Sequence, residues 1–233
     1  MVDLSAETAE LWASLGKPTP GRGRVVQLVG ARRGVGTSTV ARELALTAAR
    51  RPGASVWLVD LDVLASPQYA ALQADPERYG VLGPPSAATP DGSMFLTVQP
   101  PVAGTDGRVM ADANFVVAHQ VGDARWWVTR FLRDQMHGGQ GVHILPRHDY
   151  WDGLRKHADL IIVDCPSIDR SQAALTVAPS MDQTVLVVAA DDPDVRGPAV
   201  LRDSLSAAGA DVAGIFFNRA TVETPDFLKA LLP

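Results

Sequence analysis

The stretch VVQLVGARRGVGTST, residues 25–39, decides the fold of this chain. An apolar run leads into a turn containing two glycines, and the turn opens an Ala- and Leu-rich helix predicted from about Thr37 to Arg50. Backbone N–H groups at such a helix start converge on an anion. The pattern indicates a phosphate-binding loop. Its predicted contact residues are Arg33, Gly34, Val35, Gly36, Thr37, Ser38 and Thr39.

The loop lacks the lysine that usually grips the phosphates. Thr37 follows Gly36 at that position, and the three lysines of the chain (Lys17, Lys156 and Lys229) lie outside the loop. A charged hydrogen bond contributes roughly 1.5–3 kcal/mol, so nucleotide binding should weaken by about one to two decades. Removing one preorganised charge commonly costs ~10²–10³ in rate. The sequence therefore predicts nucleotide binding without fast turnover.

The composition is typical of a globular protein. The chain has 233 residues, is 46% hydrophobic and 20% charged, and carries a formal net charge of −5, which gives no general attraction to nucleic acid. We expect one domain over residues 1–233, with an N-terminal helix and linker at 1–23 and an insertion at 80–141. The single cysteine, Cys165, excludes an intrachain disulfide. Without a membrane-spanning run or a secretory signal, a cytoplasmic location is expected, at the inner face of the membrane if a partner holds it there.

Five apolar runs are predicted as strands. Runs that are apolar at nearly every position suit strands covered by helices on both faces, and helical stretches alternate with these runs. The expected fold class is therefore α/β, with a doubly wound, mainly parallel sheet flanked by helices. The runs cover residues 24–30, 55–60, 159–164, 183–189 and 211–219, and a short helix is expected before them at residues 6–15.

The middle of the chain differs from this pattern. Residues 80–114 are rich in proline and glycine and predict a loop, interrupted by a short strand near residues 94–98. Residues 115–120 and 124–132 predict a β-hairpin that carries Trp126 and Trp127. These tryptophans are interpreted as hairpin packing, with a partner-binding aromatic patch as the alternative.

Three acidic residues end predicted strands close to the loop. Asp164 would hold Mg²⁺ together with the hydroxyl of Ser38, and Asp60 and Asp62 would flank the terminal phosphate, where one of them could accept a proton or orient a water. Each signal is weak alone, because aspartates often end strands. In this order and spacing, together with the loop, they indicate a nucleotide site.

These motifs resemble the MinD/ParA class of deviant P-loop ATPases over nearly the whole chain. VWLVDLD at residues 56–62 matches the Walker A′ segment of that class, and IIVDCP at residues 161–166 matches Walker B. Within the class the chain is similar to the cytoplasmic kinase domains of bacterial tyrosine kinases (BY-kinases) of exopolysaccharide biosynthesis, including HfsB-like proteins of holdfast or capsule synthesis. The strand end at Asn218 and Arg219 resembles the position that recognises adenine.

The resemblance implies ligands and partners. It implies ATP or ADP with Mg²⁺ as cofactors, and a homodimer or higher homo-oligomer. It also implies docking on the cytoplasmic segment of a membrane polysaccharide co-polymerase or chain-length regulator.

The chain departs from the family pattern at several places. Arg32 stands at the signature-lysine position, from which relatives reach across a dimer, and it would complete the catalytic set of Asp60 and Asp62. Leu64 stands where Walker A′ carries an arginine. The chain end lacks the tyrosine cluster that the kinases phosphorylate, since the three tyrosines are Tyr69, Tyr79 and Tyr150. Autophosphorylation of a tail is therefore not expected.

Three functions compete at this stage. The favoured one is a degenerate ATP-binding regulator of exopolysaccharide polymerisation or export, with weak or no kinase or ATPase activity. The second is an active ATPase or tyrosine kinase that uses Arg32 in place of the lysine, and the third is a MinD/ParA-like positioning protein for a pilus or polar machine. Structural interpretations also stay open: Arg32 and Arg33 as a surface pair, Asp62 as a helix cap, and Asn218 as a turn residue.

Overall fold

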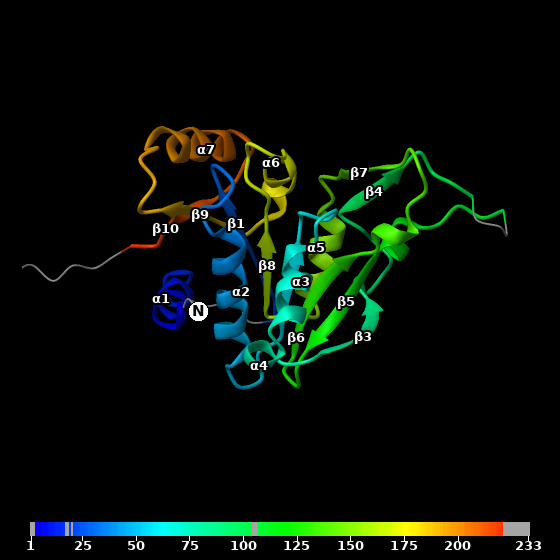
Figure 1. Cartoon of the computed structure of the whole chain (residues 1–233), viewed down its shortest axis with the longest axis horizontal. Helices are drawn as coiled ribbons and strands as arrows, with labels where there is room; N and C mark the ends of the chain where they lie inside the picture. The colour runs from blue at the N-terminus through cyan, green and yellow to red at the C-terminus, as the bar shows by residue number, and fades with distance from the viewer. Residues whose placement is uncertain (1–2, 17–18, 20, 104–106, 221–233) are drawn as a thin grey trace, which may run out of the picture.

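Strands and helices alternate along the chain in the computed structural model, which describes residues 3–16, 19, 21–103 and 107–220 (Figure 1). The strands are β1 (Arg24–Gly30), β2 (Val56–Asp60), β3 (Leu82–Ala87), β4 (Leu96–Gln99), β5 (Val116–Val121), β6 (Trp126–Phe131), β7 (Gly141–Ile144), β8 (Leu160–Asp164), β9 (Gln183–Ala189) and β10 (Val212–Asn218). The helices are α1 (Ser5–Ser14), α2 (Thr37–Ala49), α3 (Pro67–Ala74), α4 (Pro76–Tyr79), α5 (His148–Arg155), α6 (Ala173–Val177) and α7 (Arg196–Ala207). Short 3-10 turns cover Asp112–Phe115, Arg133–Gln135 and Ala178–Ser180.

One large sheet organises the molecule. It has eight strands in the order β10-β9-β1-β8-β2-β6-β5-β3. The pairings from β10 to β6 are parallel, whereas β5 and β3 pair antiparallel with their neighbours. β4 and β7 form a separate two-stranded antiparallel sheet. This architecture confirms the predicted α/β class with a mainly parallel, helix-flanked sheet.

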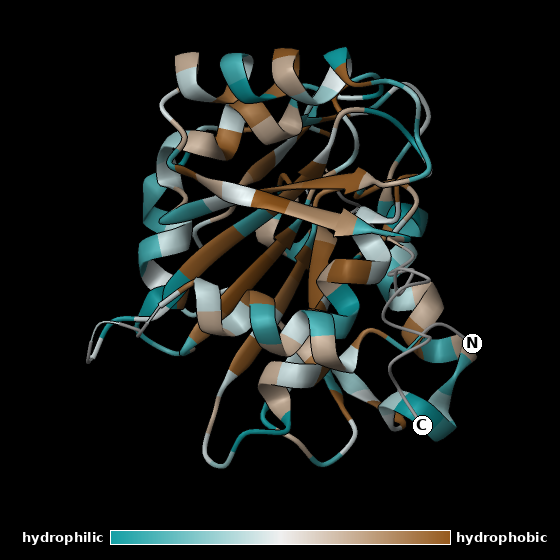
Figure 2. Cartoon of the chain, turned by 90° about the vertical axis from the view of Figure 1, so that its left-hand side faces the viewer, coloured by the Kyte–Doolittle hydropathy of each residue, from teal (hydrophilic) through white to brown (hydrophobic). Residues whose placement is uncertain are grey.

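The large sheet separates two hydrophobic cores. Val25 and Val29 of β1 contribute to the core formed with α5, α6 and α7, whereas Val26 and Leu28 contribute to the core formed with α1 and α2. Because both faces are covered, β1 is apolar at nearly every position, as the sequence pattern predicted. Figure 2 shows the brown, apolar strands enclosed between helices that carry teal residues on their outer sides.

The predicted N-terminal helix is α1, and its bounds differ by one residue at each end. α1 packs along α2, where Leu11 is buried in the core and the hydroxyl oxygens of Thr8 and Thr47 lie 2.7 Å apart. Of the helices in the described ranges, none is long and apolar enough to cross a bilayer.

The predicted hairpin is formed by β5 and β6, and it extends the large sheet because β6 pairs with β2. Trp126 is buried, and Trp127 stacks on Trp57 with ring centroids 5.8 Å apart. These contacts favour the packing interpretation of the two tryptophans.

The prediction of a loop over residues 80–114 is wrong at β3. This strand pairs antiparallel with β5 although it contains Pro84 and Pro85, and its register shifts between Leu82 and Pro85. β3 is the edge strand of the sheet, so a proline there can lack an N–H without breaking an internal ladder. The short strand expected near residues 94–98 is β4, and its partner β7 was not predicted.

Candidate functional site

The carboxyl ends of β1, β8 and β2 meet at one edge of the sheet and open into a cavity of about 480 Å³. Most of the predicted site residues line this cavity: Arg32, Arg33, Gly34, Gly36, Thr37, Ser38, Thr39, Asp62, Asp164 and Arg219. Val35, Asp60 and Asn218 lie behind its wall, and each of these three is buried. The volume is within the usual range of small-molecule sites.

The glycines give the loop its shape. Gly34 and Gly36 have φ angles of +91° and +94°, which side-chain-bearing residues rarely adopt. A Cβ atom on Gly36 would lie 2.0 Å from Nδ2 of Asn218. The loop can therefore follow this path only with glycine at position 36.

Asn218 supports the loop from the end of β10. Its Nδ2 donates a 2.9 Å hydrogen bond to the Val35 carbonyl, and its Oδ1 accepts one of 3.0 Å from the backbone N–H of Arg219. This geometry makes Asn218 a brace for the loop. Its predicted contact with an adenine base stays a prediction.

Helix α2 begins at Thr37, directly behind the loop, and no side chain caps its first turn. The first N–H groups of a helix have no partner within the helix, and the helix dipole favours an anion there. The first-turn residues Thr37, Ser38 and Thr39 line the cavity. The loop and helix thus present backbone donors to the cavity, while Thr37 offers a hydroxyl where a cation would be expected.

Asp164 is fully buried beside this helix start. Burial raises its pKa to about 6, against the lowering effect of Ser38, Gln68 and Arg42. Its Oδ2 accepts a 2.7 Å hydrogen bond from Nε2 of Gln68, while Oδ1 has no hydrogen-bond partner among the described residues. A buried carboxylate oxygen without a donor, next to the Ser38 hydroxyl at the cavity wall, is a chemically suitable place for Mg²⁺.

A metal at Asp164 would need oxygen ligands from elsewhere. Within the described ranges, no group of three His, Cys, Asp or Glu side chains could hold a metal ion. Mg²⁺ commonly keeps several waters and takes substrate phosphates as ligands beside one or two carboxylates. The donor set of Ser38 and Asp164 fits that mode of binding.

Asp60 lies in register with Asp164 on the neighbouring strand. Burial and the charge of Asp164 raise its pKa well above the ordinary value. Its oxygens accept hydrogen bonds of 2.9 Å from the backbone N–H groups of Asp62 and Gln68. Asp60 therefore shapes the segment after β2, and the proton-accepting role predicted for it stays a prediction.

Asp62 faces the cavity and is not a helix cap. Its Oδ2 lies 2.7 Å from Nη1 of Arg170, a residue of the segment after β8. The interpretation of Asp62 as the cap of the next helix is wrong, because the residue before α3 is Ser66 and α3 has no side-chain cap.

Of the three arginines predicted at the site, Arg32 and Arg219 pair with other residues of the chain. Arg32 forms an ion pair with Asp192. The guanidinium of Arg219 donates to the Gly34 carbonyl and lies 3.4 Å from Asp191. The reach of Arg32 across a dimer interface stays a prediction.

Two further residues, Gln68 and Arg170, contribute to the site, and no motif in the sequence marked them. Gln68 donates hydrogen bonds from Nε2 to the Ser38 carbonyl (2.8 Å) and to Asp164, and its Oε1 accepts a 3.0 Å bond from Nη1 of Arg42. Arg170 also lines the cavity. The one feature of the sequence that could have pointed to Arg170 is its position shortly after the Asp164-Cys165-Pro166 segment.

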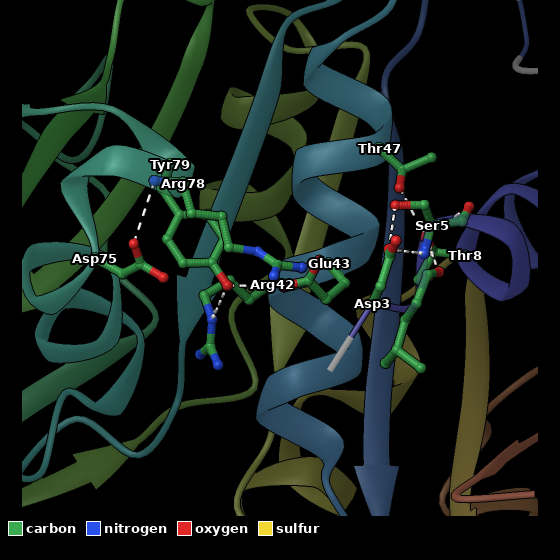
Figure 3. Close-up of polar contacts among 10 residues, drawn as sticks. Asp3, Ser5, Thr8, Arg42, Glu43, Thr47, Asp75, Arg78 and Tyr79 are labelled. Atoms are coloured by element: carbon green, nitrogen blue, oxygen red, sulfur yellow. Dashed lines mark hydrogen bonds and ion pairs between the residues drawn. The ribbon is translucent and has the colours of Figure 1, made fainter. Parts of the chain in front are cut away.

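Contacts on both sides fix α2 in position (Figure 3). On one side, Tyr79 of α4 donates a 2.7 Å hydrogen bond to Glu43 and accepts one of 3.2 Å from Arg42. Arg78 adds a 2.6 Å ion pair to Glu43. On the other side, Thr47 meets Thr8 of α1. The helix that presents its N-terminus to the cavity is thus held by polar contacts as well as by the core.

Solved structures with the same fold include a tyrosine kinase domain, a nucleotide-binding protein and a cell division protein. The kinase domain of the Escherichia coli tyrosine kinase ETK superposes with a TM-score of 0.57 at 15% identity, covering 93% of this chain and 74% of that one. The nucleotide-binding protein from Archaeoglobus fulgidus, in complex with ADP, gives 0.53 at 18% identity (95% and 74%). The cell division protein MinD from Aquifex aeolicus gives 0.51 at 14% identity (90% and 78%). No protein-family model and no curated protein matches the sequence.

These likenesses establish the fold. The chain has the architecture of bacterial tyrosine kinase domains and of MinD-like P-loop ATPases, as the sequence resemblance implied. The motifs that carried the resemblance lie together around one cavity, although the ends of β2 and β8, at Asp60 and Asp164, are more than 100 residues apart in sequence.

The close approach of Gly36 and Asn218 can be tested by substitution. We expect Gly36→Ala to lower the free energy of unfolding by about 1 kcal/mol more than Gly34→Ala, because both changes strain a positive φ but only the first also meets a neighbouring side chain. Chemical denaturation measures both losses. In an Asn218→Ala background the difference should shrink, and equal losses in the wild-type background would contradict the close approach of Gly36 to Asn218.

The burial of Asp164 predicts an unusual pH dependence for the nucleotide-free protein. The unfolded carboxyl loses its proton near its ordinary pKa of 3.8, whereas the folded one keeps it up to about 6. The free energy of unfolding should therefore fall as pH rises through this window, by an amount on the order of 3 kcal/mol for Asp164. Asp164→Asn should remove most of this fall, and it also relieves Asp60 of the neighbouring charge.

Denaturation curves from pH 4 to 7.5, without nucleotide or Mg²⁺, check this expectation. At pH 7.5 Asp164→Asn should be more stable than the wild type. Asp203→Asn, at an exposed position on α7, is the matched control and should keep the wild-type profile. A flat wild-type profile would contradict the account of Asp164.

Proposed function

We propose that this chain is a nucleotide-binding regulator of exopolysaccharide polymerisation or export. It takes ATP or ADP with Mg²⁺ and has weak or no phosphoryl-transfer activity. The observation that carries the proposal is the open cavity in which the glycine loop, the uncapped start of α2 and the buried Asp164 converge with Thr37 at the lysine position.

Nucleotide binding is supported by the donors of the cavity. The backbone of residues 34–39 and the helix dipole favour a polyphosphate, and Ser38 with Asp164 suits the accompanying Mg²⁺. The fold of this chain is also that of a protein solved with ADP. The bound metal would neutralise phosphate charge, while Gln68 and Asp60 keep the segments around it in place.

Slow chemistry is supported by the charge arrangement. The position of the phosphate-gripping lysine carries the uncharged Thr37, and Arg32 is paired with Asp192. Arg219 is bound to the loop backbone. Stabilisation of a transition state requires preorganised charges that point at the transferred group. The guanidinium groups of Arg32 and Arg219 are instead held by Asp192 and by the Gly34 carbonyl.

The partner and location belong to the same proposal. The likeness to a bacterial tyrosine kinase domain supports docking on the cytoplasmic segment of a membrane polysaccharide co-polymerase or chain-length regulator, as a homodimer or higher oligomer. The chain would then act in the cytoplasm at the inner face of the membrane. Holdfast-type or capsule-type polysaccharides are the products that the sequence resemblance favours.

Two other functions share the fold. An active ATPase or tyrosine kinase would use Arg32, which would first have to leave Asp192. A positioning protein for a pilus or polar machine is favoured by the likeness to MinD. Deletion separates the latter from the main proposal: loss of surface polysaccharide supports the regulator, and loss of pili supports the positioning protein.

Calorimetric titration of the purified protein with Mg·ATP tests nucleotide binding. We expect a dissociation constant below the millimolar ATP of a cell, and Thr37→Lys should tighten it by about 10- to 100-fold, because one charged hydrogen bond is restored. Thr37→Ser, which adds no charge, is the matched control and should bind like the wild type. Absence of binding at millimolar nucleotide would contradict the proposal and leave a scaffold.

Radiolabelled turnover tests the catalytic alternative. We expect wild type, Arg32→Ala and Asp60→Ala to show the same background rate of phosphate release and transfer. A wild-type rate well above that of both variants would overturn the assignment of weak or no activity.

A further inference from the structure

The chain lacks both basic side chains that the family motifs place near the phosphates. Thr37 stands at the Walker lysine position, and Leu64 stands at the arginine position of Walker A′. Leu64 is 49% exposed and is not among the residues that line the cavity. The cation for a polyphosphate in this cavity would therefore have to come from the arginines that line it.

Four arginines line the cavity: Arg32, Arg33, Arg170 and Arg219. Arg32 and Arg219 are turned to the side of the loop where Asp192 and Asp191 lie. Arg33 is exposed on the loop itself, where its backbone N–H donates to Asp169 at 3.4 Å. Arg170 is the arginine that contacts Asp62, on the Walker A′ side.

The segment that carries Arg170 is fixed to the phosphate loop. The backbone N–H of Ile168 donates a 3.3 Å hydrogen bond to the Gly30 carbonyl, at the start of the loop. The N–H of Arg170 itself closes a turn onto the Ser167 carbonyl at 2.9 Å. Arg170 therefore extends its side chain from a backbone that the loop holds in place.

The ion pair between Arg170 and Asp62 is weak enough for another anion to take the place of Asp62. The side chains are 42% and 20% exposed, and partly exposed ion pairs of this kind contribute little to stability. A terminal phosphate carries more negative charge than one carboxylate, and the planar guanidinium can bind two of its oxygens at once. Bound nucleotide can thus replace Asp62 as the partner of Arg170.

We propose that Arg170 supplies the phosphate-binding cation of this site and leaves Asp62 for the terminal phosphate of Mg·ATP. This assignment rests on the proposed nucleotide binding and deepens it. Asp62 competes with the nucleotide for Arg170, so the ion pair between the segments after β2 and β8 is made in the empty site and broken in the loaded one.

Calorimetric titration with Mg·ATP and with Mg·ADP tests the assignment. Arg170→Ala should weaken ATP binding by about 10- to 100-fold and ADP binding by less, because the terminal phosphate is missing from ADP. Asp62→Asn should change affinity in the opposite direction and tighten ATP binding severalfold. A residue that merely supported the fold would not separate ATP from ADP in this way.

Controls separate the possible failures. Arg202→Ala, at an exposed position on α7 beside Asp203, should bind both nucleotides like the wild type. Arg170→Lys should recover part of the lost ATP affinity. Thermal unfolding confirms that each variant is folded.

Unchanged ATP binding by Arg170→Ala, beside a wild type that binds, overturns the assignment of Arg170 and leaves the proposed function standing. Equal losses for ATP and ADP also overturn it. No binding by the wild type overturns the proposed function and this assignment together.

Discussion

The site depends on the burial of Asp60 and Asp164 side by side at the ends of neighbouring parallel strands, which is unfavourable in free energy for ionised carboxylates. Parallel pairing brings these carboxyl ends to the same edge of the sheet, because β1, β8 and β2 run in the same direction. Burial raises the pKa of both carboxyl groups, and the charge of Asp164 adds to the rise at Asp60. The free oxygen of Asp164 is then the atom that a cation would stabilise most.

Hydrogen bonds from the surrounding residues offset part of the free-energy cost of burying Asp60 and Asp164. Gln68 donates to both Asp164 and the Ser38 carbonyl, and the backbone N–H groups of Asp62 and Gln68 satisfy Asp60. Since these donors come from the segment after β2, that segment and the start of α2 are fixed to each other. Around Asp60, Asp164 and the start of α2, the candidate site is therefore built largely from main-chain and amide donors.

Much of the fold could be predicted from the sequence because the central strands are buried on both faces. Runs such as residues 160–163 are apolar throughout, and the helix after the glycine loop begins at its predicted residue, Thr37. β3 could not be predicted, because its two prolines argue against a strand unless the strand is known to lie at a sheet edge. Edge position is a property of the assembled sheet.

The motifs in the sequence predicted which segments meet at the cavity. The loop, Asp62 and Asp164 do line one cavity. Gln68 and Arg170 could not be found, because their roles come from contacts with residues far away in sequence, Asp164 and Asp62 respectively. Asn218 illustrates the same limit: its position at a strand end was read from the sequence, but its hydrogen bond to Val35 depends on how β10 meets the loop.

A crystal structure with a non-hydrolysable Mg·ATP analogue tests the central claim most directly. The account predicts phosphates held by the backbone N–H groups of residues 34–39, with Mg²⁺ on the Ser38 hydroxyl and on Asp164, either directly or through water. A loop that stays empty at millimolar analogue, or that is filled by an arginine side chain, would contradict it.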